Sequence, residues 1–399
     1  MDEFRFLSRN FACNFLASLF FFGSYYLLLP TLPHYVVETG ASKVQAGVII
    51  GIFTLAAVLC RPYFGKLADA YGRKRLMLFG TGLFSIMYIM YIVYMAYCQA
   101  NEYAPLYPIR LIHGLGYAAF LPATTAYAAD LAPVDRRGEV MGIFGITNVF
   151  AMATFPALGI AIVHHSNSFS LLCIVGTFFA ISAFFASLLV REVRKPAGRY
   201  SAGASLFAVA RQNVILVAAA AMFAGTTVYG ALTTFLPVYA VERGFVDFGL
   251  FFTMYAVGSL SSRLILGKVS DRIGRYQIIV LGLVLLGLAS FLLASLSQFS
   301  ILIISGMCAG MGFGALVPTL IALAADKIKP QERGSALGFL TSFLDLGISA
   351  GAIVLGFVGE YWGYAALFAF GGFFPVAGII VIAFYLLFSM AANKQNIAG

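Results

Sequence analysis

Long apolar stretches alternate with short polar segments along the whole sequence and divide the chain into twelve parts. Most stretches reach about twenty residues, the length that an α-helix needs to cross the hydrocarbon core of a bilayer. A helix also satisfies its own backbone hydrogen bonds, as a segment in lipid must. We therefore predict membrane-spanning helices at residues 10–36, 44–66, 76–98, 104–128, 139–163, 168–190, 213–240, 247–267, 276–296, 299–324, 335–358 and 363–390.

The amino-acid composition agrees with this pattern. Hydrophobic residues make up 61% of the 399 residues, charged residues make up 10%, and the mean hydropathy is +0.93. Such a chain cannot cover itself with polar surface, so the bilayer is its solvent. The first residues, MDEFRFLSRN, carry acids where a secretory signal is basic and lead to no small-residue cleavage site. We expect the first helix to be retained.

The basic residues are distributed unevenly between the two sides that these helices define. With the N-terminus inside, Lys43 and Arg243 fall outside, and Arg61, Arg110 and Arg263 fall within spans. The other 20 of the 25 lysines and arginines fall inside, as the positive-inside rule requires. This predicts a multi-pass protein of the cytoplasmic (inner) membrane with both termini in the cytoplasm. The net charge of +9 then needs no nucleic-acid partner.

Four segments of the first half recur in the second half in the same order. The offsets between the copies are 204, 202, 196 and 196 residues, close to half of 399, which indicates an internal duplication. An even number of spans per half makes the copies parallel repeats. The paired segments are 25–40 with 229–244, 61–73 with 263–275, 114–122 with 310–318, and 130–142 with 326–338.

A basic segment rich in small residues, 191–212, separates the two copies. It predicts two pseudo-symmetric six-helix bundles, residues 1–190 and 213–399, joined by a cytoplasmic linker. Two such bundles that rock about a central site provide a known route to alternating access.

The charged segment GKLADAYGRKR at residues 65–75 interrupts the apolar pattern. Gly65 and Gly72 permit a tight turn and a close approach of helices, because glycine has no Cβ. Asp69 can pair with Arg73 or lie near a helix N-terminus, where the helix dipole favours an anion. The alternative is that the basic residues of this segment only enforce the topology.

GKLADAYGRK resembles the loop between helices 2 and 3 of the major facilitator superfamily, and PIRLIHGLGYAAFLP resembles its helix 4 motif. The resemblance extends over essentially the whole chain, in order and orientation. It implies the all-α superfamily fold of twelve transmembrane helices, and a loop that latches the two halves on the cytoplasmic side. The implied gating residues, including a weaker second copy in GKVSDRIGR, are Gly65, Asp69, Gly72, Arg73, Lys74, Asp271 and Arg275.

Polar residues that only one half carries inside its spans are candidates for the specific function, because the repeat does not explain the cost of burying them. The second half has Gly306 in place of Arg110. It has Ala309 in place of His113. At helical spacing the arginine and the histidine share a face with Tyr117. The resemblance implies a role for this arginine in proton coupling or binding; the alternative is that both side chains hold helices together.

Asp345 lies ten residues after the start of the expected helix 335–358, near the bilayer midplane, whereas the other acids fall in loops or at helix ends. A carboxylate there is removed from water and could take up and release a proton during transport. The alternative is an aspartate held by hydrogen bonds to Ser342 or Ser349, three and four residues away on the same face.

Other polar side chains in the spans could together line an aromatic, modestly polar cavity. Each taken alone is typical of helix–helix contacts, where small and hydroxyl residues are common. These candidates are Tyr25, Tyr26, Asn148, Thr226 and Tyr229.

Enzymatic motifs are absent from the sequence, which has no GxxxxGK[ST], HExxH, GxSxG or EF-hand pattern. The five cysteines show no CxxC spacing. We therefore expect a protein that is not an enzyme and that has no cofactor and no metal site.

The segment LPHYVVETG followed by RPYFGKLADAYGRK looks like bacterial sugar, multidrug and metallophore efflux permeases, although ATFPALGIAI matches the exporters' helix 5 pattern only in part. The leading hypothesis is a secondary transporter, monomeric like many superfamily members, that exports a small organic molecule by proton-coupled, rocker-switch alternating access. The alternatives are a proton-coupled importer of a sugar, organic acid or metallophore, a lipid flippase, and a non-transporting membrane sensor.

Overall fold

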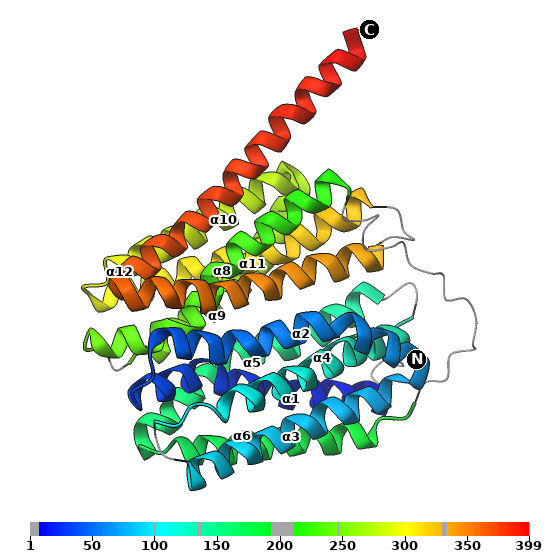
Figure 1. Ribbon diagram of the computed structural model, residues 1–399. Helices are drawn as coiled ribbons and strands as arrows, with labels where there is room; N and C mark the ends of the chain where they lie inside the picture. Colours follow the sequence, from blue (N-terminus) through cyan, green and yellow to red (C-terminus); the bar gives the residue numbers. More distant parts are fainter. Residues whose placement is uncertain are drawn as a thin grey trace. The chain divides into compact units, whose positions relative to one another are not determined.

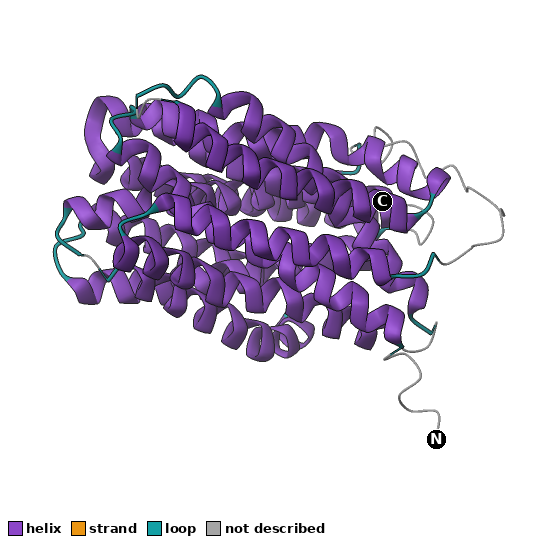
Figure 2. Ribbon diagram, turned by 90° about the horizontal axis from the view of Figure 1, so that it is seen from below, coloured by secondary structure: helices purple, strands orange, loops and turns teal. Residues whose placement is uncertain are grey.

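The computed structural model describes residues 8–98, 101–133, 137–192, 211–245, 247–328 and 333–398, in which every regular element is an α-helix (Figures 1 and 2). The helices are α1 (Arg9–Glu38), α2 (Lys43–Tyr71), α3 (Arg73–Tyr97), α4 (Leu106–Leu131), α5 (Arg137–Ser166), α6 (Phe169–Leu189), α8 (Asn213–Glu242), α9 (Gly249–Ile273), α10 (Arg275–Ala294), α11 (Phe299–Lys327) and α12 (Arg333–Ala398).

The chain forms two compact units, unit 1 (Met1–Gly198) and unit 2 (Arg199–Gly399). Unit 1 holds α1 to α6, and unit 2 holds α8 to α12. Helix α12 is two consecutive helices, because Gly363 has a left-handed backbone with φ 81° that interrupts the helical conformation. The prediction of twelve helices in two six-helix bundles is confirmed for the described part of the chain.

Ten described stretches are long and apolar enough to cross a membrane, and one of them, Ala336–Phe388, runs through both parts of α12. Helix α4 is not among them. Arg110, His113 and the prolines and tyrosines of α4 lower its hydropathy. In unit 1, α4 packs against both α2 and α3, and this packing buries Arg110, His113 and Thr124.

The two units pack their helices in the same order. In unit 1, α4 packs against α2 and α3, while α1 packs against α5 and α6. In unit 2, α11 packs against α9 and α10, while α8 packs against α12, whose two parts take the places of α5 and α6. The packing therefore follows the duplication seen in the sequence.

One glycine in each unit lets two of these helices approach closely. A Cβ at Gly114 of α4 would collide with the carbonyl oxygen of Phe53 on α2. Gly310 of α11 stands in the same relation to the carbonyl oxygen of Tyr255 on α9. Such backbone contacts need a residue without a side chain and are common between membrane helices. Both glycines lie in a repeated motif, GLGYAAFLP and GMGFGALVP, so the duplication extends to the packing.

Candidate functional site

The arginine predicted in helix 4 lies in the interior of unit 1. Arg110 is only 2% exposed. Its Nε donates a hydrogen bond of 3.1 Å to the carbonyl oxygen of Ile49 on α2, and its guanidinium carbon lies 4.4 Å from the centre of the Phe53 ring. Among the described residues, no carboxylate lies within ion-pair distance of it. The buried cation is therefore stabilised by a carbonyl dipole and an aromatic face.

A tyrosine of α3 connects this arginine to the predicted histidine. His113 is 1% exposed, and its Nδ1 lies 3.3 Å from the hydroxyl oxygen of Tyr91. The Arg110 guanidinium is within hydrogen-bonding reach of the same hydroxyl. In the described part of the chain, Nε2 of His113 has no hydrogen-bond partner. The centre of the imidazole ring lies 4.0 Å from the centre of the Phe84 ring. The structure thus brings the two predicted residues together through Tyr91, which the sequence pattern did not single out.

At the corresponding place in unit 2 the helices are in direct contact. Phe251 follows Ile49 by 202 residues, the offset of that repeat. A Cβ at Gly306, the counterpart of Arg110, would lie 2.7 Å from the Phe251 carbonyl oxygen. Equivalent carbonyl groups therefore accept a hydrogen bond from a guanidinium in unit 1 and contact a glycine in unit 2.

Each unit also contains a triad of aromatic rings from its first, second and fourth helices. The ring centres are 5.1 to 5.5 Å apart in unit 1 and 4.8 to 6.1 Å apart in unit 2. The members of the two triads correspond by the offsets of the repeat. The triads are Tyr25, Phe53 and Tyr117 in unit 1, and Tyr229, Tyr255 and Phe313 in unit 2.

The other cavity candidates have different surroundings. Tyr26 is buried, with its ring centre 4.9 Å from that of Tyr25. Asn148 on α5 is half-buried. The hydroxyl of Thr226 donates a 2.8 Å hydrogen bond to the carbonyl one turn earlier in α8, and Gly347 of α12 packs against it. Thr226 therefore contributes to a helix–helix contact.

Asp345 is buried in unit 2, on the first part of α12, with 3% of its surface exposed. The following turn packs directly on α8, since a Cβ at Gly351 would collide with the carbonyl oxygen of Thr227. Ser349 donates a 3.0 Å hydrogen bond to the backbone carbonyl of Asp345. Ser342 donates one of 2.9 Å to the carbonyl four residues earlier. Both serine hydroxyls thus donate to backbone carbonyl groups of their own helix.

The charged segment forms the turn between α2 and α3 in unit 1, and its copy forms the turn between α9 and α10 in unit 2. Gly72 and Gly274 are the single residues between these helices, with φ of 101° and 108°. Other residues rarely adopt this left-handed conformation. Gly65 lies inside α2, and a Cβ there would meet no described atom within 4 Å, so the turn depends on Gly72. The side chains of Asp69 and Asp271 lie outside the described residues.

An arginine after each turn forms an ion pair with an aspartate near the end of the fourth helix of its unit. Arg73 Nε lies 3.5 Å from Asp130 Oδ2, and Arg275 Nε lies 3.0 Å from Asp326 Oδ2. The first pair is the more buried, with side chains 14% and 9% exposed against 25% and 51%. The pairing of Asp69 with Arg73 stays a prediction, and the sequence pattern singled out neither Asp130 nor Asp326. The available signal was that each begins a repeated segment, DLAPVDRRGEVMG or DKIKPQERGSALG.

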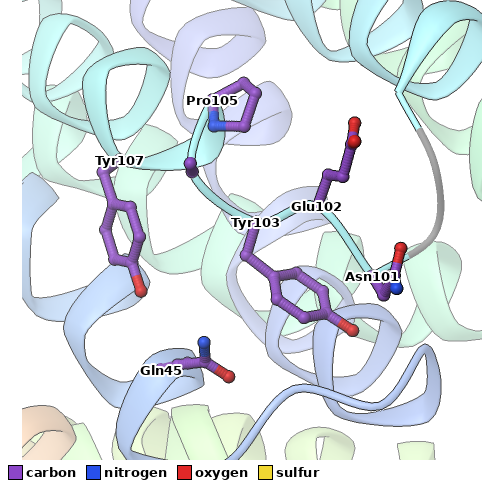
Figure 3. A pocket seen from close by; sticks show the side chains of 7 residues that line it. Gln45, Asn101, Glu102, Tyr103, Pro105 and Tyr107 are labelled. Atoms are coloured by element: carbon purple, nitrogen blue, oxygen red, sulfur yellow. The ribbon is translucent and has the colours of Figure 1, made fainter.

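A pocket of about 510 Å³ with a mixed polar and apolar lining lies beside the loop between α3 and α4 in unit 1 (Figure 3). Two of its side chains hold local structure: Gln45 Oε1 accepts from the Ser42 backbone N–H, and the Tyr103 hydroxyl donates to the Thr39 carbonyl oxygen. No predicted site residue is among its described lining residues, which are Gln45, Asn101, Glu102, Tyr103, Ala104, Pro105 and Tyr107. The described part of the chain also contains no group of three or more His, Cys, Asp or Glu side chains that could hold a metal ion.

Two units of membrane-length helices, duplicated packing and a charged turn in each unit define a membrane protein built from two repeated helix bundles. The profile of the Major Facilitator Superfamily matches residues 15–248 and 245–399. The chain belongs to this superfamily and is a multi-pass membrane protein, and the resemblance found in the sequence is confirmed.

Similar proteins carry transport and export names. The Staphylopine export protein of Staphylococcus aureus is 24% identical over 391 residues, which cover 94% of each chain. The Multi-drug resistance efflux pump PmrA homolog of Lactococcus lactis is 24% identical over 390 residues, which cover 93% of each chain. A crystallised variant of the nucleoside transporter NupG has a TM-score of 0.79 and 15% identity, with 95% of this chain and 99% of that chain covered. This last likeness shows the fold, and the names of all three denote transporters rather than enzymes.

Proposed function

We propose that this transporter exports a small organic molecule across the cytoplasmic membrane in exchange for protons, by alternating access. Membership of the superfamily supports transport. The names of two relatives, an export protein and an efflux pump, support the outward direction. The excess of Lys and Arg on one side supports cytoplasmic termini, and we take the working form to be a monomer.

The observation that carries the proton coupling is Asp345. It is a buried acid in the apolar first part of α12, where an ionised carboxylate is costly and a proton removes that cost. Ionisable residues inside membrane spans mark ion and proton pathways. Asp345 is therefore assigned as the proton carrier.

The buried polar residues of unit 1, Arg110 and His113, then bind the substrate or modulate the proton coupling. Arg110 is a permanent cation without a carboxylate partner among the described residues. The Tyr91 hydroxyl is near both Arg110 and His113 and so connects the two side chains. The aromatic triads place Tyr25 and Tyr229 in equivalent positions, which suits them to contact a ring or another apolar part of the substrate.

The test is transport by purified protein in proteoliposomes with an imposed pH gradient. The probes are ethidium, staphylopine and uridine, which stand for the substrate types in the relatives' names. The wild type is compared with Asp345→Asn, which keeps the shape but removes the charge. Asp247→Asn, the same change at an exposed residue of unit 2, is the control.

We expect the wild type to move one probe against the proton flow. In Asp345→Asn the stimulation of transport by the pH gradient should fall tenfold or more, about 1.4 kcal/mol. The control Asp247→Asn should keep the wild-type stimulation. Probe movement in the same direction as protons would overturn export. Equal gradient dependence in wild type and Asp345→Asn would overturn the assignment of Asp345.

A further inference from the structure

The first residues after α6 are in contact with the turn between α2 and α3. Glu192 lies three residues beyond the end of α6 at Leu189. Its Oε1 accepts a hydrogen bond of 2.9 Å from the backbone N–H of Arg73, and its Oε2 accepts one of 3.0 Å from that of Lys74. These are the first two residues of α3. A carboxylate from 118 or more residues away along the chain thus caps the helix.

The cap is needed because α3 begins without one of its own. The first N–H groups of an α-helix have no partner within the helix, and the side chain of the preceding residue commonly supplies one. Here that residue is Gly72, which has no side chain and makes no cap bond. A Cβ on Gly72 would lie 2.8 Å from the carboxyl carbon of Glu192. Glycine is therefore required both for the turn and for the room that the carboxylate occupies.

The backbone just before Glu192 is held by other helices of unit 1. The carbonyl oxygen of Arg191 accepts a 2.6 Å hydrogen bond from the Tyr127 hydroxyl of α4, and its N–H donates one of 3.2 Å to Asn10 Oδ1 of α1. Lys74 Nζ donates a 2.8 Å hydrogen bond to the Leu188 carbonyl oxygen. These bonds fix where the carboxylate stands relative to the turn.

The corresponding turn of unit 2 shows no such carboxylate contact among its described residues. Helix α10 begins after Gly274 with no side-chain cap bond, and the nearest side chain to that glycine is Gln277 of the same helix. The two turns share the glycine and the arginine–aspartate pair, and among the described contacts a carboxylate clamp is seen at the first turn.

We propose that Glu192 is a positioning residue for the gating turn of unit 1. Its carboxylate fixes the start of α3, and with it the backbone of Arg73, whose side chain pairs with Asp130. Through the same bonds residues 191 and 192 are tied to the turn, so that their position and the position of the turn are coupled. This goes beyond the proposed function, because it holds for either direction of transport and for any coupling ion.

The experiment compares Glu192→Ala, which removes both acceptors, with Glu192→Gln, which keeps one acceptor oxygen, in the full-length protein in detergent. Hydrogen–deuterium exchange of the peptide covering residues 73–78 reports on the two capped N–H groups. The peptide covering 275–280 in unit 2 is the internal reference. Gln277→Ala is the matched control, since it removes the side chain nearest the other turn glycine.

Turnover and KM are then measured in proteoliposomes without a gradient, by counterflow of whichever of ethidium, staphylopine and uridine the wild type carries. We expect Glu192→Ala to speed exchange in 73–78 and to lower turnover by about three- to tenfold with KM unchanged, the size of one or two hydrogen bonds to a charged group in partial contact with water. Glu192→Gln should fall between Ala and Glu in both measurements, and Gln277→Ala should change neither.

Unchanged exchange in 73–78 for Glu192→Ala would overturn the clamp. Faster exchange with unchanged turnover would overturn its role in gating. Because counterflow needs no proton gradient, neither result bears on proton coupling or on export, and failure of the two proposals can be told apart.

Discussion

Unit 1 and unit 2 use the same scaffold for different side chains. Their helices pack in the same order, and Gly114 and Gly310 make equivalent backbone contacts. At the next pair of equivalent positions they diverge: Arg110 donates to a carbonyl oxygen of α2, whereas Gly306 rests on the corresponding carbonyl of α9. Among the described residues, unit 2 has a buried acid in Asp345 that has no counterpart in unit 1.

The comparison separates two kinds of constraint. Positions that both units share serve close packing and the turn geometry, because the same backbone contacts recur wherever the same residues recur. Positions that one unit changes carry charge into the membrane, which packing alone does not require. Substitutions at the first kind should lower stability in both units alike, and substitutions at the second kind should lower transport while the fold is kept.

The largest effect is expected from filling the two shared glycine contacts. Gly114→Leu and Gly310→Leu should each destabilise the protein by about 3 kcal/mol or more, because the new side chain would overlap a backbone carbonyl that cannot move away. The measurement is the unfolding temperature and the yield of monodisperse protein in detergent. Gly145→Leu is the control, since nothing described lies within 4 Å of a Cβ there. If only one of the two variants, Gly114→Leu or Gly310→Leu, lost stability, the two glycine contacts would not be equivalent.

The two ion pairs should give a smaller and unequal pair of effects. Asp130→Asn breaks the more buried pair and should lower the free energy of unfolding by up to about 3 kcal/mol. Asp326→Asn breaks a pair whose aspartate is 51% exposed, and should cost about 0 to 1 kcal/mol. Thermal unfolding at low and at high salt would show this, with the salt effect larger for the exposed pair. Equal losses would mean that burial does not set the strength of these pairs.

Replacing the buried arginine should affect transport more than stability. Arg110→Lys keeps the charge but removes the planar guanidinium. In the wild type this guanidinium lies over the Phe53 ring, and the arginine Nε donates a hydrogen bond to the Ile49 carbonyl oxygen. We expect transport in proteoliposomes to fall about tenfold, with a change of only a few degrees in the unfolding temperature. Arg9→Lys, at an exposed position of unit 1, should leave transport unchanged. Normal transport by Arg110→Lys would make this arginine a structural residue like those of the scaffold.

The smallest effect is expected at the hydroxyl that joins the arginine to the histidine. Tyr91→Phe removes one hydrogen-bonding group and should reduce transport about two- to fivefold. Tyr94→Phe is a close control, because Tyr94 is one turn further along α3 and its buried hydroxyl has no hydrogen-bond partner among the described residues. If both variants lose transport equally, the loss reflects packing of α3 rather than the bridge.

Much of the fold was predictable because it depends on features that are local in the sequence. The apolar stretches have the length of membrane helices, and the short gap before residue 363 marks the point where Gly363 divides α12. The repeat gave the correspondence between helices, and the two turn glycines followed from their motif. These signals need no knowledge of which helices meet.

The site was less predictable, because its contacts join helices that are far apart in the sequence. Arg110 and His113 were found from their charge and their helical spacing, but Tyr91 meets them from another helix. Arg73 pairs with Asp130, which lies 57 residues away along the chain and on another helix. Glu192 lies in a basic linker and matches no motif. Only the packing of unit 1 brings these groups together.

The contact between Gly306 and Phe251 has a consequence for how this chain can evolve. A mutation from arginine to glycine in unit 1 would leave an empty space, which neighbouring side chains can fill in later steps. The reverse mutation in unit 2 would need α9 and α11 to separate first, and Gly310 a turn later holds them together. An arginine at this position is therefore easier to remove from unit 1 than to introduce into unit 2.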